Sequence, residues 1–146
     1  MAETKKSSGG GFTAEERAAM KERAKELKAE KEAKSKEQDE AAVLEKISEM
    51  KDADRAMATR IHEIVKAVAP QLTSRLWYGS PAYAKDGKVV CFFQDSNKFK
   101  TRYATVGFSD EAALDDGTMW PNSYALTEIT PDVVTRVRDL LTRAVS

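Results

Sequence analysis

Apolar residues recur at helical spacing in two neighbouring stretches near the middle of the chain. The first stretch is Val43, Leu44, Ile47 and Met50, and the second is Met57, Ile61, Ile64, Val65 and Val68. Spacings of three and four residues place such side chains on one face of a helix. Asp52 or Asp54 suits the start of the second helix, and Pro70 suits its end. We therefore expect two amphipathic helices that bury these faces against a sheet.

The pattern before residue 41 is different. Residues 14–40 are mostly Ala, Glu, Lys and Arg, which favour helix, and their only large apolar side chains are Met20 and Leu27. Thr13 and Glu16 fit a capping box at the start of this stretch. Two apolar residues one heptad apart neither anchor a helix on a core nor form a coiled-coil seam. The sequence predicts a charged arm over residues 1–40, solvated as a helix or disordered, and a domain over residues 41–146.

Residues 81–108 have the composition of β structure. Asp86 and Gly87 separate the runs 82–85 and 88–94, and an Asp-Gly pair in this setting is typical of a β-hairpin. Residues 89–93 are apolar without alternation, which indicates a central strand covered on both faces. Residues 99–108 alternate and are predicted to form a third strand.

The C-terminal part of the chain contains signals for a short helix, a strand and a closing helix. Ser109 and the two acids after it predict a helix that ends at Asp116 and Gly117. Residues 124–129 are the predicted fourth strand, and Thr130 followed by proline predicts the start of the last helix. Together these elements predict an α+β domain, an antiparallel sheet of about four strands packed with helices.

Charge and composition narrow the classes of function. Charged residues make up 33% of the chain, and residues 1–40 contain ten Lys or Arg and ten Asp or Glu. The net charge of zero argues against a general polyanion binder, so nucleic acid is not expected as a general partner, and the arm is the candidate surface for a protein partner. No apolar stretch reaches the roughly 18 residues of a membrane span, and no signal region is evident. We expect a cytoplasmic protein without membrane contact.

Four residues with rings lie close together where the helical pattern passes into the hairpin. They are Trp77, Tyr78, Pro81 and Tyr83, and Trp120 is a further aromatic candidate. There are two explanations for these rings. They line a pocket for a flat or apolar ligand, or they pack in the core at the end of the sheet.

Basic residues concentrate in residues 71–109, whose net charge is +4. Lys98, Lys100 and Arg102 would share one face of the predicted third strand, with Phe99 and Tyr103 on the other face. These cations are candidates for binding an anionic metabolite or a single-stranded nucleic acid. Stacking and charge pairing need rings and cations on one surface, which alternation prevents, so a solvated face is the alternative.

Residues 110–132 are the acidic counterpart, with a net charge of −6. Asp110, Glu111, Asp115 and Asp116 are candidate ligands for a hard cation, and iron is the metal considered. Helix capping and turn formation are the alternative explanation for these acids. No spacing typical of a histidine metal site or a calcium loop is present.

Residues 76–83, with the sequence Leu-Trp-Tyr-Gly-Ser-Pro-Ala-Tyr, are the most characteristic stretch of the chain. With the hairpin over residues 85–90, residues 98–100 and the run 103–108, they resemble the YdhG-like family over roughly residues 40–146. That family is largely catalogued as a domain of unknown function. The resemblance implies a compact fold likened to frataxin, and some relatives are described as intracellular iron chaperones. It carries no catalytic residues to this chain.

The sequence contains no catalytic motif. His62 is the only histidine and is expected at the edge of the apolar stripe, without a nucleophile beside it. Cys91 has an apolar setting typical of a buried side chain. We therefore expect a small binding module that holds a small ligand or iron. The alternative is an interaction protein that binds a protein or a nucleic acid through the charged arm and the basic strand face.

Overall fold

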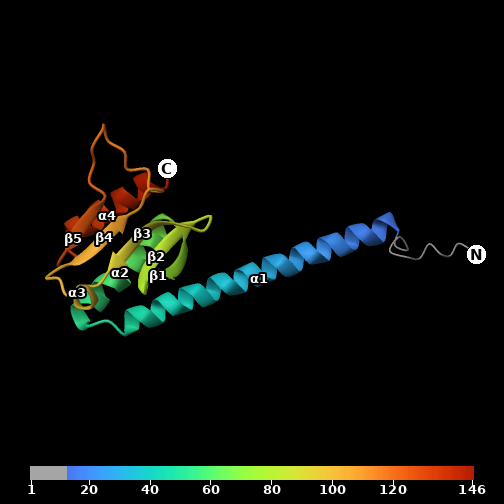
Figure 1. Cartoon of the computed structure of the whole chain (residues 1–146), viewed down its shortest axis with the longest axis horizontal. Helices are drawn as coiled ribbons and strands as arrows, with labels where there is room; N and C mark the ends of the chain where they lie inside the picture. The colour runs from blue at the N-terminus through green and yellow to red at the C-terminus, as the bar shows by residue number, and fades with distance from the viewer. Residues whose placement is uncertain (1–12) are drawn as a thin grey trace, which may run out of the picture. The chain divides into compact units, whose positions relative to one another are not determined.

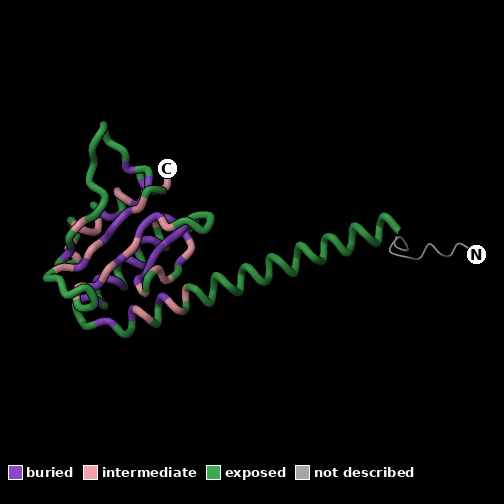
Figure 2. Tube along the Cα trace, in the orientation of Figure 1, coloured by how far each residue is buried: buried purple, intermediate pink, exposed green. Residues whose placement is uncertain are grey.

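The computed structural model describes residues 13–146, and the chain divides into two compact units, Met1–Ser35 and Lys36–Ser146. In the first unit the described residues from Ala14 onward are helical and exposed (Figure 2). The capping box is confirmed: the Thr13 amide donates to Glu16 Oε1 at 2.8 Å, and the Glu16 amide donates to Thr13 Oγ1 at 3.0 Å. This part of the chain is therefore helical but has no apolar face to bury.

Helix α1 spans Ala14–Ser48, so the predicted boundary at residue 40 falls inside one continuous helix. Val43 and Ile47, near its end, are buried in the core of the second unit. Helix α2 spans Asp52–Val68 and buries the predicted stripe. Its N-cap residue is Lys51, without a side-chain cap, so the expectation that Asp52 or Asp54 caps this helix is wrong.

Five strands form one antiparallel sheet in the order β1-β2-β3-β4-β5 (Figure 1). They span Thr73–Trp77, Ser80–Lys85, Lys88–Gln94, Ala104–Phe108 and Ser123–Leu126. The predicted hairpin is confirmed, since Asp86 and Gly87 join β2 to β3 with φ angles of 51° and 80°. Strand β3 is central, as its apolar sequence predicts, and the α+β class is confirmed.

Three elements differ from the sequence prediction. Strand β1 was not predicted. The third predicted strand begins only at Ala104, because Ser96–Phe99 form the short helix α3, capped by Asp95, and Lys100 takes a left-handed conformation with φ 56°. The short helix expected after Ser109 is absent, and residues 109–122 form an irregular loop between β4 and β5. The last helix, α4, spans Pro131–Ala144 and is capped by Thr130 as predicted.

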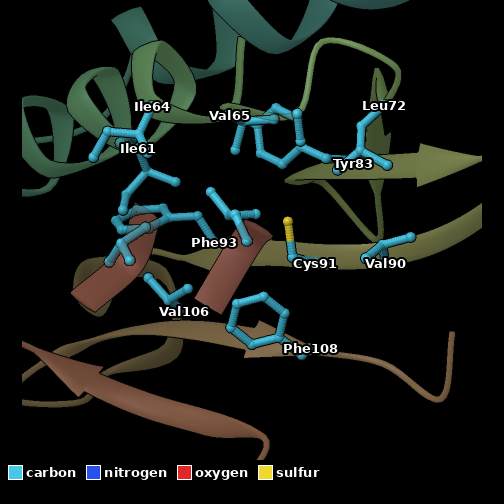
Figure 3. Packing of buried hydrophobic residues seen from close by; sticks show 14 of the residues in the cluster. Ile61, Ile64, Val65, Leu72, Tyr83, Val90, Cys91, Phe93, Val106 and Phe108 are labelled. Atoms are coloured by element: carbon cyan, nitrogen blue, oxygen red, sulfur yellow. The ribbon is translucent and has the colours of Figure 1, made fainter. Parts of the chain in front are cut away.

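The helices cover one face of the sheet only. Side chains of α2, α4 and the end of α1 share a single core with Tyr83, Cys91, Phe93 and Val106 (Figure 3). The expectation that β3 is covered on both faces is wrong, since α2 and α4 lie beside each other on the same side. On the opposite face of β3, Phe92 is partly covered by Trp77 and by the backbone of β4 at Gly107. Among residues 13–146, no helix is long and apolar enough to cross a membrane.

Candidate functional site

The face of the sheet without helices has a row of aromatic rings. Phe92 points away from the core, because Cys91 and Phe93 on either side of it point inward. The centroid of the Phe92 ring lies 5.0 Å from that of Trp77, and the Trp77 ring lies 5.0 Å from that of Tyr78. We call Tyr78, Trp77 and Phe92 the aromatic row, and we call this side of the sheet the open face. Register pairing adds Arg75, Ala82 and Gly107 to the same face.

The end of the row is held in a strained turn. Tyr78 and Gly79 join β1 to β2 with φ angles of 51° and 77°. A tyrosine with positive φ is uncommon, because its Cβ crowds the backbone. The Lys98 ammonium group donates a hydrogen bond to the Tyr78 carbonyl at 2.7 Å, across from α3. The turn presents the Tyr78 ring to solvent, and the residue is 83% exposed.

Small residues lie beneath the larger rings. Ala82 and Ser80 are buried although they are on the open face, and Ser80 pairs directly with Trp77. A Cβ atom added to Gly107 would lie 2.2 Å from Phe92 Cζ, so the phenyl ring rests on the backbone of β4. Among the described residues, the Ser80 hydroxyl is buried without a hydrogen-bond partner. Such a group is rare in folded proteins, and the Ser74 hydroxyl on the core side of β1 is a second one among the described residues.

Of the predicted anion-binding residues, Lys98 reaches the aromatic row, through its hydrogen bond to the Tyr78 carbonyl. Lys98 belongs to α3, and Lys100 and Arg102 follow it before β4 begins, so these cations do not share one strand face as predicted. Lys98 Nζ lies 5.3 Å from the centre of the Phe99 ring, and Arg102 Cζ lies 5.4 Å from that of Tyr103. The expected separation of rings from cations is therefore wrong, because alternation does not apply outside a strand.

These cations are not neutralised by nearby acids. Within residues 13–146, no salt bridge involves Lys98, Lys100, Arg102 or Arg75. The buried acids near α3 are already satisfied by backbone donors: Asp95 accepts from the Lys98 amide, and Asp54 accepts from the Ser96 and Asn97 amides. The open face thus combines the exposed Tyr78 ring and the half-buried Trp77 and Phe92 rings with the exposed Arg75, and Lys98 lies at the turn beside Tyr78.

The predicted pocket residues do not lie in one place. Trp77 and Tyr78 lie on the open face, whereas Pro81 and Tyr83 are buried on the other side of β2. Trp120 lies in the loop after β4, beside a hollow of about 270 Å³ that Phe108, Asp110 and Asp115 also line. Pro81 and Tyr83 therefore pack in the core, which is the alternative to a ligand pocket. Phe92 was not predicted as a site residue. Its position between the inward-facing Cys91 and Phe93 places its side chain on the other face of β3.

A partly buried polar network connects α1, α2 and β2 on the core side. His62 Nδ1 lies 2.9 Å from Tyr83 Oη, and its Nε2 lies 3.3 Å from Glu40 Oε2. Lys66 donates to Glu40 at 2.8 Å, and this hydrogen bond is the main cause that lowers the pKa of the Glu40 carboxyl group. Burial raises the pKa of the Tyr83 hydroxyl, and it raises that of the Cys91 thiol to about 12. Neither group is therefore ionised as a nucleophile, and the network is structural.

Replacing Tyr83 with phenylalanine tests that structural role. The change keeps the ring in the core but leaves His62 Nδ1 buried without its partner, so we expect the free energy of unfolding to fall by about 1–3 kcal/mol. Urea denaturation measures the loss. Tyr103→Phe is the matched control, since no hydrogen bond of that hydroxyl is present among the described residues. Equal stability of the Tyr83→Phe variant and the wild type would contradict the assignment.

The acids considered as metal ligands do not converge. In the part of the chain that the structure describes, no group of three or more His, Cys, Asp or Glu side chains could hold a metal ion. Asp110, Glu111, Asp115 and Asp116 are exposed on the loop after β4. Helix capping does not explain these four acids, because no helix forms in residues 109–122. Asp132, by contrast, lies in the first turn of α4 as predicted. Iron binding stays a prediction without a ligand set in residues 13–146.

Comparisons of the chain with family models, with curated proteins and with solved structures found no match. The function must therefore be argued from the geometry of the open face and its neighbouring cations.

Proposed function

We propose that the chain is a cytoplasmic binding module of the YdhG-like type that holds a flat, anionic ligand on its open face. The observation that supports this proposal is the aromatic row itself. Three rings follow one another at centroid distances of 5.0 Å on a surface that no helix covers, with Arg75 on the same face and Lys98 at the Tyr78 turn. Exposed apolar surface bordered by charge is typical of interaction sites. Aromatic faces bind flat ligands, and the cations supply the counter-charge.

The arrangement supports binding better than catalysis. The polar groups that could act as acid or base, His62 and Tyr83, are buried on the opposite side of the sheet from the row. The acidic loop provides no metal ligand set among the described residues. The further role of residues 1–40 in recruiting a protein partner stays a prediction, for which Met20 and Leu27 are the only large exposed apolar side chains in the described part of the arm.

A flat aromatic sulfonate tests the proposed site. We expect 1-anilinonaphthalene-8-sulfonate to bind the native protein and to gain fluorescence, because its rings match the row and its sulfonate matches the cations. Trp77→Ala should weaken this binding by about tenfold or more, since base-like rings stacked on an aromatic side chain contribute about 1–3 kcal/mol. Trp120→Ala, which removes the chain's other tryptophan, should leave the affinity unchanged.

Circular dichroism must show that both variants are folded, because this dye also binds partly unfolded proteins. Dye binding that survives Trp77→Ala in a folded protein, or that is lost equally with Trp120→Ala, would contradict the proposed site.

A further inference from the structure

Strand β5 leaves one edge of the sheet without a pairing partner. It is the last strand in the order and, among the described residues, pairs only with β4 (Figure 1). The Phe108 amide donates to the carbonyl group of Asn122, which lies opposite it, at 2.8 Å. Hydrogen-bonded and non-hydrogen-bonded pairs alternate along an antiparallel ladder, so Ser123 and Ala125 direct their amide and carbonyl groups away from β4. These outer groups are available to another strand.

The β5 edge lacks most of the features that keep edge strands from pairing with other chains. Such strands usually carry charged side chains, proline or a bulge. The sequence of β5 is Ser-Tyr-Ala-Leu, whereas β1, at the opposite edge, carries the exposed Arg75. The protection of β5 is its length of four residues. A partner that pairs with so short a strand therefore needs further contacts beside it.

An apolar groove between β5 and α4 offers those contacts. Tyr124 and Leu126 lie on the helix side of the sheet, because they pair with core residues of β4. Together with Val133 and Leu140 of α4 they line a hollow of about 120 Å³. A second hollow of about 200 Å³ extends the groove to Pro121 and shares Tyr124 and Leu140 with the first. A strand added at the β5 edge places every second side chain on the side of this groove.

The wall of the groove carries a positive charge without an acidic partner. Arg136 of α4 lines both hollows and forms no salt bridge within residues 13–146, whereas Arg143 is paired with Asp139 at 3.6 Å. Glu128, two residues after β5, is exposed and also has no salt bridge in the described part of the chain. The groove therefore lacks a carboxylate, and the segment that follows β5 carries one.

We propose that this surface binds a second copy of the chain, with the two β5 strands paired antiparallel about a twofold axis at Ala125. Ala125 then lies opposite Ala125 of the second copy, and the two residues exchange both backbone hydrogen bonds. Tyr124 lies beside Leu126 of the second copy on the helix side, so each copy adds apolar side chains to the groove of the other. The interface uses the same patch on both copies, as a twofold dimer requires.

The same register brings the two unpaired charges together. Glu128 of the second copy lies opposite Asn122, next to Pro121, and Pro121 lines one hollow together with Arg136. The twofold axis repeats this contact on the other copy. A register centred on Tyr124 would move the carboxylate past Pro121 and away from the groove. Charge complementarity therefore selects Ala125 as the centre of the pairing.

The test measures the mass of the full chain against its concentration by sedimentation equilibrium, which does not depend on the shape of the exposed helix α1. We expect a reversible rise from the 16.2 kDa of one chain toward twice that mass. Ala125→Pro should abolish the rise, because proline lacks the amide that the second strand needs. This amide points away from β4, so the variant should remain folded, which circular dichroism checks. The Ser123 and Ala125 amides of the wild type should exchange with solvent more slowly as the concentration rises.

Charge exchange tests the register. Arg136→Glu and Glu128→Arg should each weaken dimerisation by about tenfold or more, because like charges then meet at both copies of the contact. The double variant should recover an affinity within about threefold of the wild type. Arg138→Glu is the matched control and should leave the affinity unchanged. Arg138 is another exposed arginine of α4, and it does not line the groove.

A chain that stays monomeric at every concentration would overturn the inference and leave the β5 edge to a different partner. A dimer that persists in folded Ala125→Pro would also overturn it, since another surface would then hold the two copies together. A double charge variant as weak as either single variant would contradict the assigned register. Dye binding on the open face does not depend on any of these results, so their failure leaves the proposed function standing.

Discussion

Replacing Phe93 with alanine is expected to lower the free energy of unfolding by about 3–5 kcal/mol. The Phe93 side chain is fully buried on the central strand, between α2 and the neighbouring strand β4 (Figure 3). Its removal loses the transfer free energy of the ring and leaves a cavity that the surrounding sheet cannot close. Urea denaturation followed by circular dichroism measures the loss as a lower midpoint with an unchanged slope.

The matched control is Phe99→Ala. Sequence alternation predicted Phe99 on a third strand, but it lies on α3 and is 41% exposed. Among residues 13–146 its one ring contact is with the flexible Lys98 side chain, so the loss should stay below about 1 kcal/mol. Similar losses for the two phenylalanine variants would contradict the assignment of Phe93 to the core and of Phe99 to the surface.

Replacing Gly107 with alanine is expected to displace the Phe92 ring and to destabilise the protein by about 1–3 kcal/mol. The new methyl group would lie 2.2 Å from Phe92 Cζ, which is far closer than two carbon atoms can approach. Gly107 does not have a positive φ, so the cost comes from the ring and not from the backbone. Because Phe92 contacts Trp77, the displacement should also change the fluorescence of Trp77.

A double-mutant cycle identifies the cause of this effect. In a Phe92→Ala background the ring is absent, so Gly107→Ala should cost much less than it does in the wild type. The coupling free energy should be about 1 kcal/mol or more. Additive effects of the two substitutions would show that the phenyl ring does not rest on Gly107, and the aromatic row would then lose its described geometry.

The sequence was sufficient to predict those turns and helix starts that are determined by residues close to one another in the chain. The capping box at Thr13, the hairpin at Asp86 and Gly87 and the capped start of α4 at Thr130 all formed as predicted. The same is true of α2, whose apolar stripe is long enough to define a face. Each of these features needs only residues within a few positions of one another.

Strand β1 and helix α3 were missed because their signals are short or unusual. The turn between β1 and β2 has the form of a two-residue hairpin, but Tyr78 occupies a position that Asn or Asp usually fills. Helix α3 has four residues, too few for a periodic pattern, and its cap is a single aspartate. The alternation of residues 99–103 was therefore interpreted as a strand.

The aromatic row depends on pairing between strands that are distant in the sequence. Trp77 and Phe92 lie on one face only because β1 pairs with β2 and β2 with β3 in a particular register, with an irregularity between Tyr83 and Ala84. Without β1, the sequence placed Trp77 and Tyr83 in one group, whereas the sheet separates them. The row is therefore a property of the assembled sheet.

The most direct test of the open face as the ligand site is an amide NMR titration of the isotope-labelled protein with 1-anilinonaphthalene-8-sulfonate. We expect the largest shift changes at residues 75–80, at Phe92 and at the indole group of Trp77, with α2 and α4 unaffected. Shift changes concentrated in the loop of residues 109–122 or on the helices would contradict the account.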